Sequence, residues 1–370
     1  MIVDVQHLKL ESFHTKLGAK FVSFAGYRMP ISYPLGVKGE HLQTRKAIGL
    51  FDVSHMGQII IEGPQAAEAL EKLVPAALQE MKPGQIRYSQ LTLENGGILD
   101  DLMLTRWDKN SWGLVVNGAC KFDDIKHLEQ YLDASILMTH LEDLCLIAVQ
   151  GPRARLALSS IMPEAADLVF MQSIRTTWNN IEIVLSCCGY TGEDGYEISI
   201  HKDHAETLAI KLTDLEEATW VGLGARNSLR LETGLCLYGN DLTRDTTPIE
   251  AGLIWSIQKR RRIEGGFLGA EVICKQIEIG ADRKRVGITP LDGRTPIRDH
   301  TLLKTEGGEL VGEITSGGFG PTHNGPIAMA YISHNVSAIE TTLVAEVRGK
   351  ALPCKVCDPG FVKQHYIRAL

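Results

Sequence analysis

IIIEGPQAAEALEKLVP at residues 59–75 and LIAVQGPRARLALSSIMP at residues 146–163 follow one plan. Each reads as an apolar strand, a Gly-Pro pair, an amphipathic helix and a closing proline. Pro64 and Pro152 stand near the first helical turn, where the missing N–H of proline costs little. The two copies are too far apart for a solenoid repeat. We interpret them as two α+β modules of related plan.

Strand-rich segments surround both copies. IRYSQLTL and ILDDLMLTRW alternate in polarity around ENGG, which predicts a hairpin, and IEIVLSCC and YEISI flank TGEDG in the same way. A helix is predicted over residues 121–134, with Phe122, Ile125, Leu128 and Leu132 on one face. From about residue 284 onward, short β-runs between glycines predict a separate C-terminal β-domain.

Composition narrows the class of protein. The 370 residues correspond to two or three domains, and the 44% hydrophobic and 22% charged residues are typical of a globular chain. The formal net charge of −7 disfavours binding to nucleic acid or to an anionic membrane, because both are negatively charged. The sequence has no long apolar run and no signal pattern at its start, and its eight cysteines are scattered. We therefore expect a cytoplasmic protein with reduced thiols.

The common cofactor signatures do not occur. The chain lacks a P-loop, an H-E-x-x-H and a G-x-S-x-G motif, and GLGARN at residues 222–227 lacks the third glycine of a dinucleotide loop. Cys354 and Cys357 form a C-x-x-C without a second ligand pair, so we interpret them as ordinary thiols. The sequence predicts no metal site.

Two adjacent acids in GGILDDL, residues 96–102, are candidates for a functional role. Consecutive strand residues face opposite sides, so Asp100 and Asp101 are not expected to share a proton. In one interpretation, one of them is solvated and the other anchors the ENGG turn. In the other, the acid that faces inward is paired or used in chemistry.

Three further polar features each allow two interpretations. Glu197 follows the glycine turn YTGEDGY and either faces solvent or accepts two parallel N–H bonds from a planar ring edge such as that of a pterin. Arg226 and Arg230 share a helical face and either form salt bridges or anchor an anionic ligand tail. The cations at residues 259–262 form either a solvated loop or a docking site for an acidic protein.

Taken together, these segments resemble the aminomethyltransferase family, the T-proteins of the glycine cleavage system. The resemblance covers nearly the whole chain, and its motifs occur in the family's order. They are FVSFAGYRMPISY, GLFDVSHMGQ, GGILDDL, VVNGA, AVQGP, GYTGEDGYE, GLGARNSLRLE, LYGND and GEITSGGFGPT.

The resemblance implies an α+β fold in which three domains form a cloverleaf around a central channel for tetrahydrofolate. The expected domains are a discontinuous folate-binding α+β domain of residues 1–50 and 140–250, an inserted α+β domain of residues 51–139, and a barrel-like β-domain of residues 284–370. The resemblance also implies antiparallel sheets.

Site residues are also implied by matching the family's motifs. Asp101 matches the catalytic carboxylate and Glu197 matches the acid that binds the pterin edge. Arg368, in the C-terminal HYIRAL, matches an arginine near the folate tail. Further pocket positions match Tyr190, Arg226, Asn117, Tyr88 and Met56. The chain departs from the family at Asn227, where Asp is usual, at Asn240, where Gln is usual, and in GFGPTHNGP.

The implied reaction is transfer of the methylene carbon from the aminomethyl-lipoyl arm of the H-protein carrier to tetrahydrofolate, with release of ammonia. It requires no metal and no flavin. Two alternatives are a folate-dependent demethylase of the same fold and a non-catalytic folate-binding protein for iron–sulfur maintenance. The latter usually carries K-G-C-Y-x-G-Q, where this chain reads TGLCLYGND. We expect a monomer that meets its carrier transiently.

Overall fold

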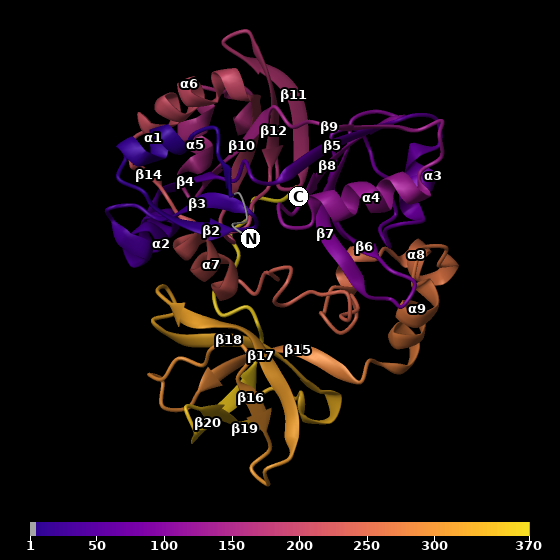
Figure 1. The fold of residues 1–370 in the computed structure, drawn as a ribbon, viewed down its shortest axis with the longest axis vertical. Coiled ribbons are helices and arrows are strands. Elements are labelled where there is room, and N and C mark those ends of the chain that lie inside the picture. The colour runs from indigo at the N-terminus through magenta and orange to yellow at the C-terminus, as the bar shows by residue number, and fades with distance from the viewer. Residues whose placement is uncertain (1–4, 370) are drawn as a thin grey trace.

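The computed structural model describes residues 5–369, so residues 1–4 and 370 of the expected terminal domains lie outside it. The described chain forms three lobes around a common centre (Figure 1). Each lobe has its own sheet and its own cluster of buried apolar side chains. No helix of residues 5–369 is long and apolar enough to span a membrane.

The first lobe is built on a six-stranded sheet in the order β11-β12-β13-β10-β4-β14. Strand β10 is apolar and buried along nearly its whole length, which suits its place between β13 and β4, with which it pairs antiparallel. The strands are β4 (Ile48–Asp52), β10 (Leu144–Gln150), β11 (Gln172–Trp178), β12 (Ile181–Cys187), β13 (Gly195–His201) and β14 (Ala218–Trp220). The chain therefore leaves this sheet after β4 and returns to it at β10.

Helices and a small sheet cover the first lobe. The helices are α1 (Glu11–Lys16), α2 (Gly36–Lys46), α5 (Ala154–Ser159), α6 (Lys202–Thr213) and α7 (Leu223–Glu232). The small sheet has the order β1-β3-β2 and comprises β1 (Gln6–His7), β2 (Lys20–Phe24) and β3 (Tyr27–Ser32). Helix α7 lies just above the barrel (Figure 1), and the Glu232 carboxylate at its C-terminal end accepts from the Thr322 and His323 amides of the barrel.

The second lobe carries a five-stranded sheet in the order β6-β7-β8-β5-β9. Its strands are β5 (Gly57–Glu62), β6 (Ile86–Thr92), β7 (Ile98–Arg106), β8 (Ser111–Val116) and β9 (Leu137–His140), and its helices are α3 (Ala66–Glu71) and α4 (Lys121–Tyr131). All four pairings are antiparallel. The hairpin predicted around ENGG is confirmed, with β6 paired to β7.

The repeated strand-Gly-Pro-helix plan is also confirmed. Strand β5 leads into α3, and β10 leads into α5, each across its Gly-Pro pair. The two copies lie in different sheets, so each builds the core of its own lobe. Leu70 of the first helix and Leu158 of the second are both fully buried in those cores.

The third lobe is a closed six-stranded barrel. Its strands are β15 (Arg283–Pro290), β16 (Leu302–Lys304), β17 (Leu310–Gly320), β18 (Gly325–Ser333), β19 (Thr342–Val347) and β20 (Lys350–Cys357). A connector with helices α8 (Lys259–Glu264) and α9 (Ala270–Ile279) joins it to the upper lobes. Short 3₁₀ turns occur at Pro163–Ala166, Ile254–Ser256 and His334–Val336.

The C-terminal tail returns from the barrel to the centre (Figure 1). The Val362 amide donates to the Glu232 carbonyl at 2.8 Å, and the His365 amide donates to the Gly192 carbonyl at 2.7 Å. The tail thereby crosses the end of α7 and reaches the turn before β13.

One helix prediction needs correction. Helix α4 ends at Tyr131 rather than at residue 134, and Phe122 is 52% exposed instead of facing the core. The inward positions are Lys121, Asp124 and Leu128, which recur at the i, i+3, i+7 spacing of one helical face. The apolar pattern alone therefore missed a buried acid.

Candidate functional site

Asp101 lies on β7 with both carboxylate oxygens held by neighbouring side chains. The Tyr88 hydroxyl on β6 donates to Oδ2 at 2.9 Å, and the Asn117 side-chain amide, just after β8, donates to Oδ1 at 2.9 Å. Burial, and next the charge of Asp100, raise the pKa of Asp101 to about 7, although both hydrogen bonds act to lower it. Three adjacent strands thus hold one carboxyl group in a fixed orientation.

Asp100 faces the other side of the strand and is fully buried. It accepts hydrogen bonds from the Asn117 backbone amide at 3.0 Å and from its side-chain amide at 2.9 Å. The turn is anchored by Asn95 instead, whose side chain accepts from the Gly97 amide at 2.9 Å. The interpretation of one solvated acid and one turn anchor is therefore wrong, because both carboxylates are bonded to Asn117.

Glu197 lies on β13 and is half-buried. Within residues 5–369 its carboxylate receives one hydrogen bond, from Cys188 Sγ at 3.5 Å. Burial raises its pKa, and the positive charge of Arg226 opposes that shift. Its remaining lone pairs are available to N–H donors of a ligand.

Arg226 and Tyr190 form the part of the site next to Glu197. The Arg226 guanidinium, on α7, lies 4.6 Å from the centre of the Tyr190 ring. No hydrogen bond to this guanidinium occurs in the described part of the chain, and the Tyr190 hydroxyl donates to the Cys236 carbonyl. Burial raises the pKa of Tyr190, and the charge of Asp101 raises it further. Tyr190 therefore connects the Arg226 and Glu197 side of the site with the Asp101 side.

Arg230, on the same helix, has a different role. It is almost fully buried and forms an ion pair with Asp241 at 2.7 Å, while its other branch donates to Ser316 of the barrel at 2.9 Å. The salt-bridge interpretation of the arginine pair therefore applies to Arg230. Arg230 forms the salt bridge, whereas Arg226 forms no ion pair within residues 5–369 and lies over the Tyr190 ring.

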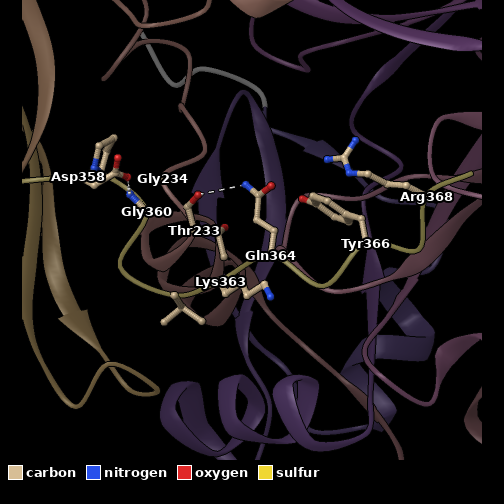
Figure 2. Close-up of a pocket in the computed structure, with 10 residues that line it drawn as sticks. Thr233, Gly234, Asp358, Gly360, Lys363, Gln364, Tyr366 and Arg368 are labelled. Carbon is tan, nitrogen blue, oxygen red and sulfur yellow. Dashed lines mark hydrogen bonds between the residues drawn. The ribbon is translucent and has the colours of Figure 1, made fainter. Parts of the chain in front are cut away.

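The two remaining predicted residues lie at the edges of the site. Met56 packs against the apolar cluster under α7 that includes Phe51 and Leu229. Arg368 is exposed in the tail, 4.8 Å above the Phe170 ring, and it lines a cavity of about 470 Å³ (Figure 2). Other lining residues are Thr233, Lys363, Gln364 and Tyr366.

Sequence reasoning missed Trp255. Its ring stacks on Tyr88 with centroids 5.5 Å apart, yet 58% of the residue is exposed. This exposed tryptophan therefore stacks on a residue that holds the Asp101 carboxylate. The sequence held only one signal for it, an isolated tryptophan in a segment without strand or helix periodicity.

The departures from the family pattern lie away from the two acids. Asn227 accepts from Arg230 Nε at 2.9 Å, and Asn240 donates to the Thr315 carbonyl at 3.1 Å. The backbone amides of Thr322 and His323, within GFGPTHNGP, both donate to Glu232. All three departures therefore serve contacts around α7 and the barrel.

The cations at residues 259–262 are largely used inside the molecule. They belong to helix α8 rather than to a loop, and Arg260 binds Glu71 at 2.5 Å and Glu80 at 2.7 Å. Arg261 is buried and donates to the Glu71 carbonyl. Within residues 5–369 no three His, Cys, Asp or Glu residues gather in a way that could hold a metal ion.

Comparison with known proteins identifies the family. The model of the GCVT N-terminal domain matches residues 10–261, and that of the glycine cleavage T-protein C-terminal barrel domain matches residues 283–363. The mitochondrial aminomethyltransferase of Dictyostelium discoideum is 40% identical over 98% of this chain and 94% of its own length. That of Mesembryanthemum crystallinum is also 40% identical, over 99% of this chain and 91% of its own length.

A solved structure agrees. The glycine cleavage system aminomethyltransferase T of Bartonella henselae superposes with a TM-score of 0.94 at 42% identity, covering 98% of this chain and all of its own. The expected fold and family are both confirmed. The chain belongs to the aminomethyltransferases, the T-proteins of the glycine cleavage system.

Proposed function

We propose that this aminomethyltransferase moves the methylene carbon of an aminomethyl-lipoyl arm to tetrahydrofolate, and that Asp101 carries the reaction. The observation behind the proposal is the Asp101 carboxylate, which is fixed by Tyr88 and Asn117 at 2.9 Å each. The charge of Asp101 acts on Tyr190, whose ring carries Arg226, and the charge of Arg226 acts in turn on the half-buried Glu197.

Glu197 and Arg226 are suited to hold the folate. The pterin edge offers two parallel N–H donors, and the Glu197 carboxylate can accept both. Arg226 is free to contact an electronegative group of the same ligand, and it is held in place over the Tyr190 ring. These residues would fix the ring so that its nucleophilic nitrogen meets the carbon in line, which is chiefly a matter of orientation.

Asp101 supplies the negative charge that the reaction needs. Positive charge develops on the carbon and nitrogen as the sulfur–carbon bond breaks, and a fixed carboxylate stabilises that charge. Because Tyr88 and Asn117 already hold the group, little reorganisation is needed during the reaction. A second folate nitrogen then bonds to the same carbon and displaces ammonia. The two protons that the folate nitrogens lose go to the sulfur and to the leaving amine, so the lipoyl group remains as the dithiol.

The cavity lined by the C-terminal tail is suited to the folate tail. Arg368 and Lys363 line it (Figure 2), and their positive charges suit the carboxylates that the glutamyl part of folate carries. Tyr366, in the same cavity, has its pKa raised by burial and, in part, by Cys188, the residue that donates to Glu197. A folate bound at Glu197 could therefore extend toward this cavity.

We also propose that the enzyme acts as a monomer, and that it meets a lipoylated H-protein transiently. The free state of all eight cysteines supports a reducing compartment such as the cytoplasm.

The test is release of ammonia from aminomethyl-loaded H-protein, with and without tetrahydrofolate. We expect strong folate-dependent release, with methylene-tetrahydrofolate as the product. H-protein without the aminomethyl group is the control. Folate binding without any release of ammonia would contradict the proposal and favour the demethylase or the iron–sulfur maintenance protein.

A further inference from the structure

Cys188, the first residue after β12, has a buried thiol to which the proposed reaction assigns no role. The residue is 4% exposed, and its Sγ donates to Oε2 of Glu197 at 3.5 Å. Burial, and next the charge of Glu197, raise the pKa of Cys188 well above its usual range. The thiol therefore keeps its proton at neutral pH and acts as a donor toward the carboxylate.

The register of the sheet brings these two side chains together. Glu197 on β13 pairs with Ser186 on β12, and Cys188 follows Ser186 by two positions along the chain. Side chains two positions apart on a strand share a face, so Cys188 is a diagonal neighbour of Glu197. Ser186 lies directly opposite, but its hydroxyl bonds to that of Ser173 at 2.8 Å. The thiol is thus the side chain that donates to Glu197 in the described part of the chain.

A buried amide fixes the backbone that carries the thiol. Gln150 is 1% exposed, its Nε2 donates to the Cys188 carbonyl at 2.9 Å, and its Oε1 accepts from the Thr191 hydroxyl at 2.8 Å. The chain passes so close to this amide that a Cβ at Gly189 would lie 1.8 Å from Gln150 Oε1. Because the segment from Cys188 to Thr191 is held at both ends, the thiol has little freedom to leave Glu197.

Few other groups act on the Glu197 carboxylate. Arg226 acts on it by charge from α7, and no ion pair between the two occurs within residues 5–369. The cross-strand neighbours of Glu197, Ala148 and Ser186, carry no charge. Tyr366 of the C-terminal tail is a further titratable group near the thiol, which raises the pKa of that tyrosine in part. The directed contact of the carboxylate is therefore the one with Cys188.

The thiol and a pterin edge can bind the carboxylate at the same time. An ionised carboxylate has about four lone-pair sites, two on each oxygen. Two parallel N–H donors use one site on each oxygen, and the thiol uses a second site on Oε2. Rotation of the carboxylate would break the contact with Cys188. The thiol therefore selects one orientation of the carboxylate before folate arrives.

We propose that Cys188 is a positioning residue for folate: its buried thiol donates to Oε2 of Glu197 and so holds the carboxylate in the orientation that accepts the pterin edge. The proposal rests on the proposed function, since it assigns a role within the folate site. The same hydrogen bond lowers the pKa of Glu197, against the effect of burial, and so favours the ionised form that can accept two N–H donors.

The test compares Cys188→Ala, Cys188→Ser and the matched control Cys187→Ala. The control removes the neighbouring buried thiol, which faces the core of the first lobe and accepts from Arg155 at 3.6 Å. We expect Cys188→Ala to raise the KM and the dissociation constant for tetrahydrofolate about 3- to 10-fold, the usual effect of one lost hydrogen bond, with a smaller change in kcat. Serine keeps a donor and should recover most of the loss, and the control should bind folate as wild type does.

Two further readouts separate positioning from a loss of stability. The first is folate binding as a function of pH. Without the thiol donor the pKa of Glu197 rises, so Cys188→Ala should lose affinity for tetrahydrofolate at a higher pH than wild type as the pH falls, while Cys187→Ala keeps the midpoint of wild type. The second is a double-mutant cycle. In the Glu197→Gln background, Cys188→Ala should add little to the loss of folate affinity, because the thiol acts through Glu197.

Folate affinity in Cys188→Ala equal to that of wild type overturns the proposal. So do an equal loss in Cys187→Ala, an unchanged pH midpoint, and additive losses in the double-mutant cycle. Failure of the proposed function would look different, because wild type would then release no ammonia from loaded H-protein, while the titrations with tetrahydrofolate would still decide the role of Cys188. A wild type that binds no tetrahydrofolate overturns both.

Discussion

The side chain of Asp101 is oriented by two hydrogen bonds, and substitution can remove its charge with little change in its shape. We expect Asp101→Asn to fold normally and to bind tetrahydrofolate, but to lose about 100- to 1000-fold in kcat, the usual cost of one preorganised electrostatic group. Turnover is measured with loaded H-protein, and folate binding is measured separately by titration. Full turnover in this variant would remove Asp101 from its role.

The raised pKa of Asp101 predicts a pH dependence. Only the ionised carboxylate stabilises developing positive charge, and the group titrates at about pH 7. We therefore expect kcat to fall as the pH drops through about 7 and to level off above it. A profile of kcat at saturating folate checks this, with folate binding measured at each pH. A flat profile across that range would contradict the assignment.

Glu197 should affect binding more than chemistry. Glu197→Gln replaces one of the two carboxylate oxygens with an NH2 group, which cannot accept a hydrogen bond from the pterin edge. The lost hydrogen bond to a charged group is worth about 1.5–3 kcal/mol. We expect the KM for tetrahydrofolate to rise about 10- to 100-fold, with a smaller change in kcat. Steady-state kinetics with folate as the varied substrate measure both. An unchanged KM would place the pterin elsewhere.

Individual residues were predictable from sequence to different degrees. Strand alternation correctly separated the faces of Asp100 and Asp101, but it could not reveal that Asn117 bridges them from the end of another strand. The choice of Asp101 came from family resemblance. Asp124 was missed because an acid in the first turn of a helix is ordinarily a solvated partner of the helix dipole.

At the scale of elements, the position of α7 sets the position of Arg226. Gly222 precedes this helix, and a Cβ there would lie 2.4 Å from the Ile31 carbonyl group on β3. Because that obstacle is backbone, Gly222→Ala must push the helix away from the small sheet. We expect a loss of about 1–3 kcal/mol in stability and a raised KM for tetrahydrofolate.

The matched control for this prediction is Gly307→Ala. A Cβ at Gly307 meets only the Thr305 hydroxyl at 3.7 Å, in an exposed turn. Thermal melts and folate kinetics of both variants make the comparison. Equal stability of the two variants would mean that α7 does not depend on the close approach to β3.

Local pattern predicted elements better than it predicted their partners. The hairpins around ENGG and TGEDG follow from alternation and turn residues, and both formed. The parallel pairing of β14 with β4 joins segments about 170 residues apart and has no local signal. The same holds for the return of the C-terminal tail to the upper lobes, which brings Arg368 to its cavity.

At the scale of the whole molecule, Glu232 at the end of α7 ties the barrel to the first lobe. Its buried carboxylate accepts from His41 at 3.0 Å and Arg45 at 3.2 Å on α2, and from the Thr322 and His323 amides of the barrel at 2.7 and 3.0 Å. Although burial opposes ionisation, these donors lower the pKa of Glu232 to about 2. One ionised group therefore connects the first lobe to the barrel.

Removing the charge of Glu232 should destabilise the folded protein by an amount that depends on pH. We expect Glu232→Gln to cost about 3 kcal/mol at pH 7, since it breaks a buried ion pair. The folded-state pKa lies below the ordinary value of 4.5, so the stabilisation is present above about pH 4.5 and is lost as the pH falls toward 2. The difference in the free energy of unfolding between wild type and Glu232→Gln should therefore disappear at acidic pH. Denaturant unfolding at several pH values measures this difference, and Glu346→Gln, which changes an exposed acid, is the control. A difference in stability that stayed constant with pH would show that Glu232 is not ionised in the folded protein.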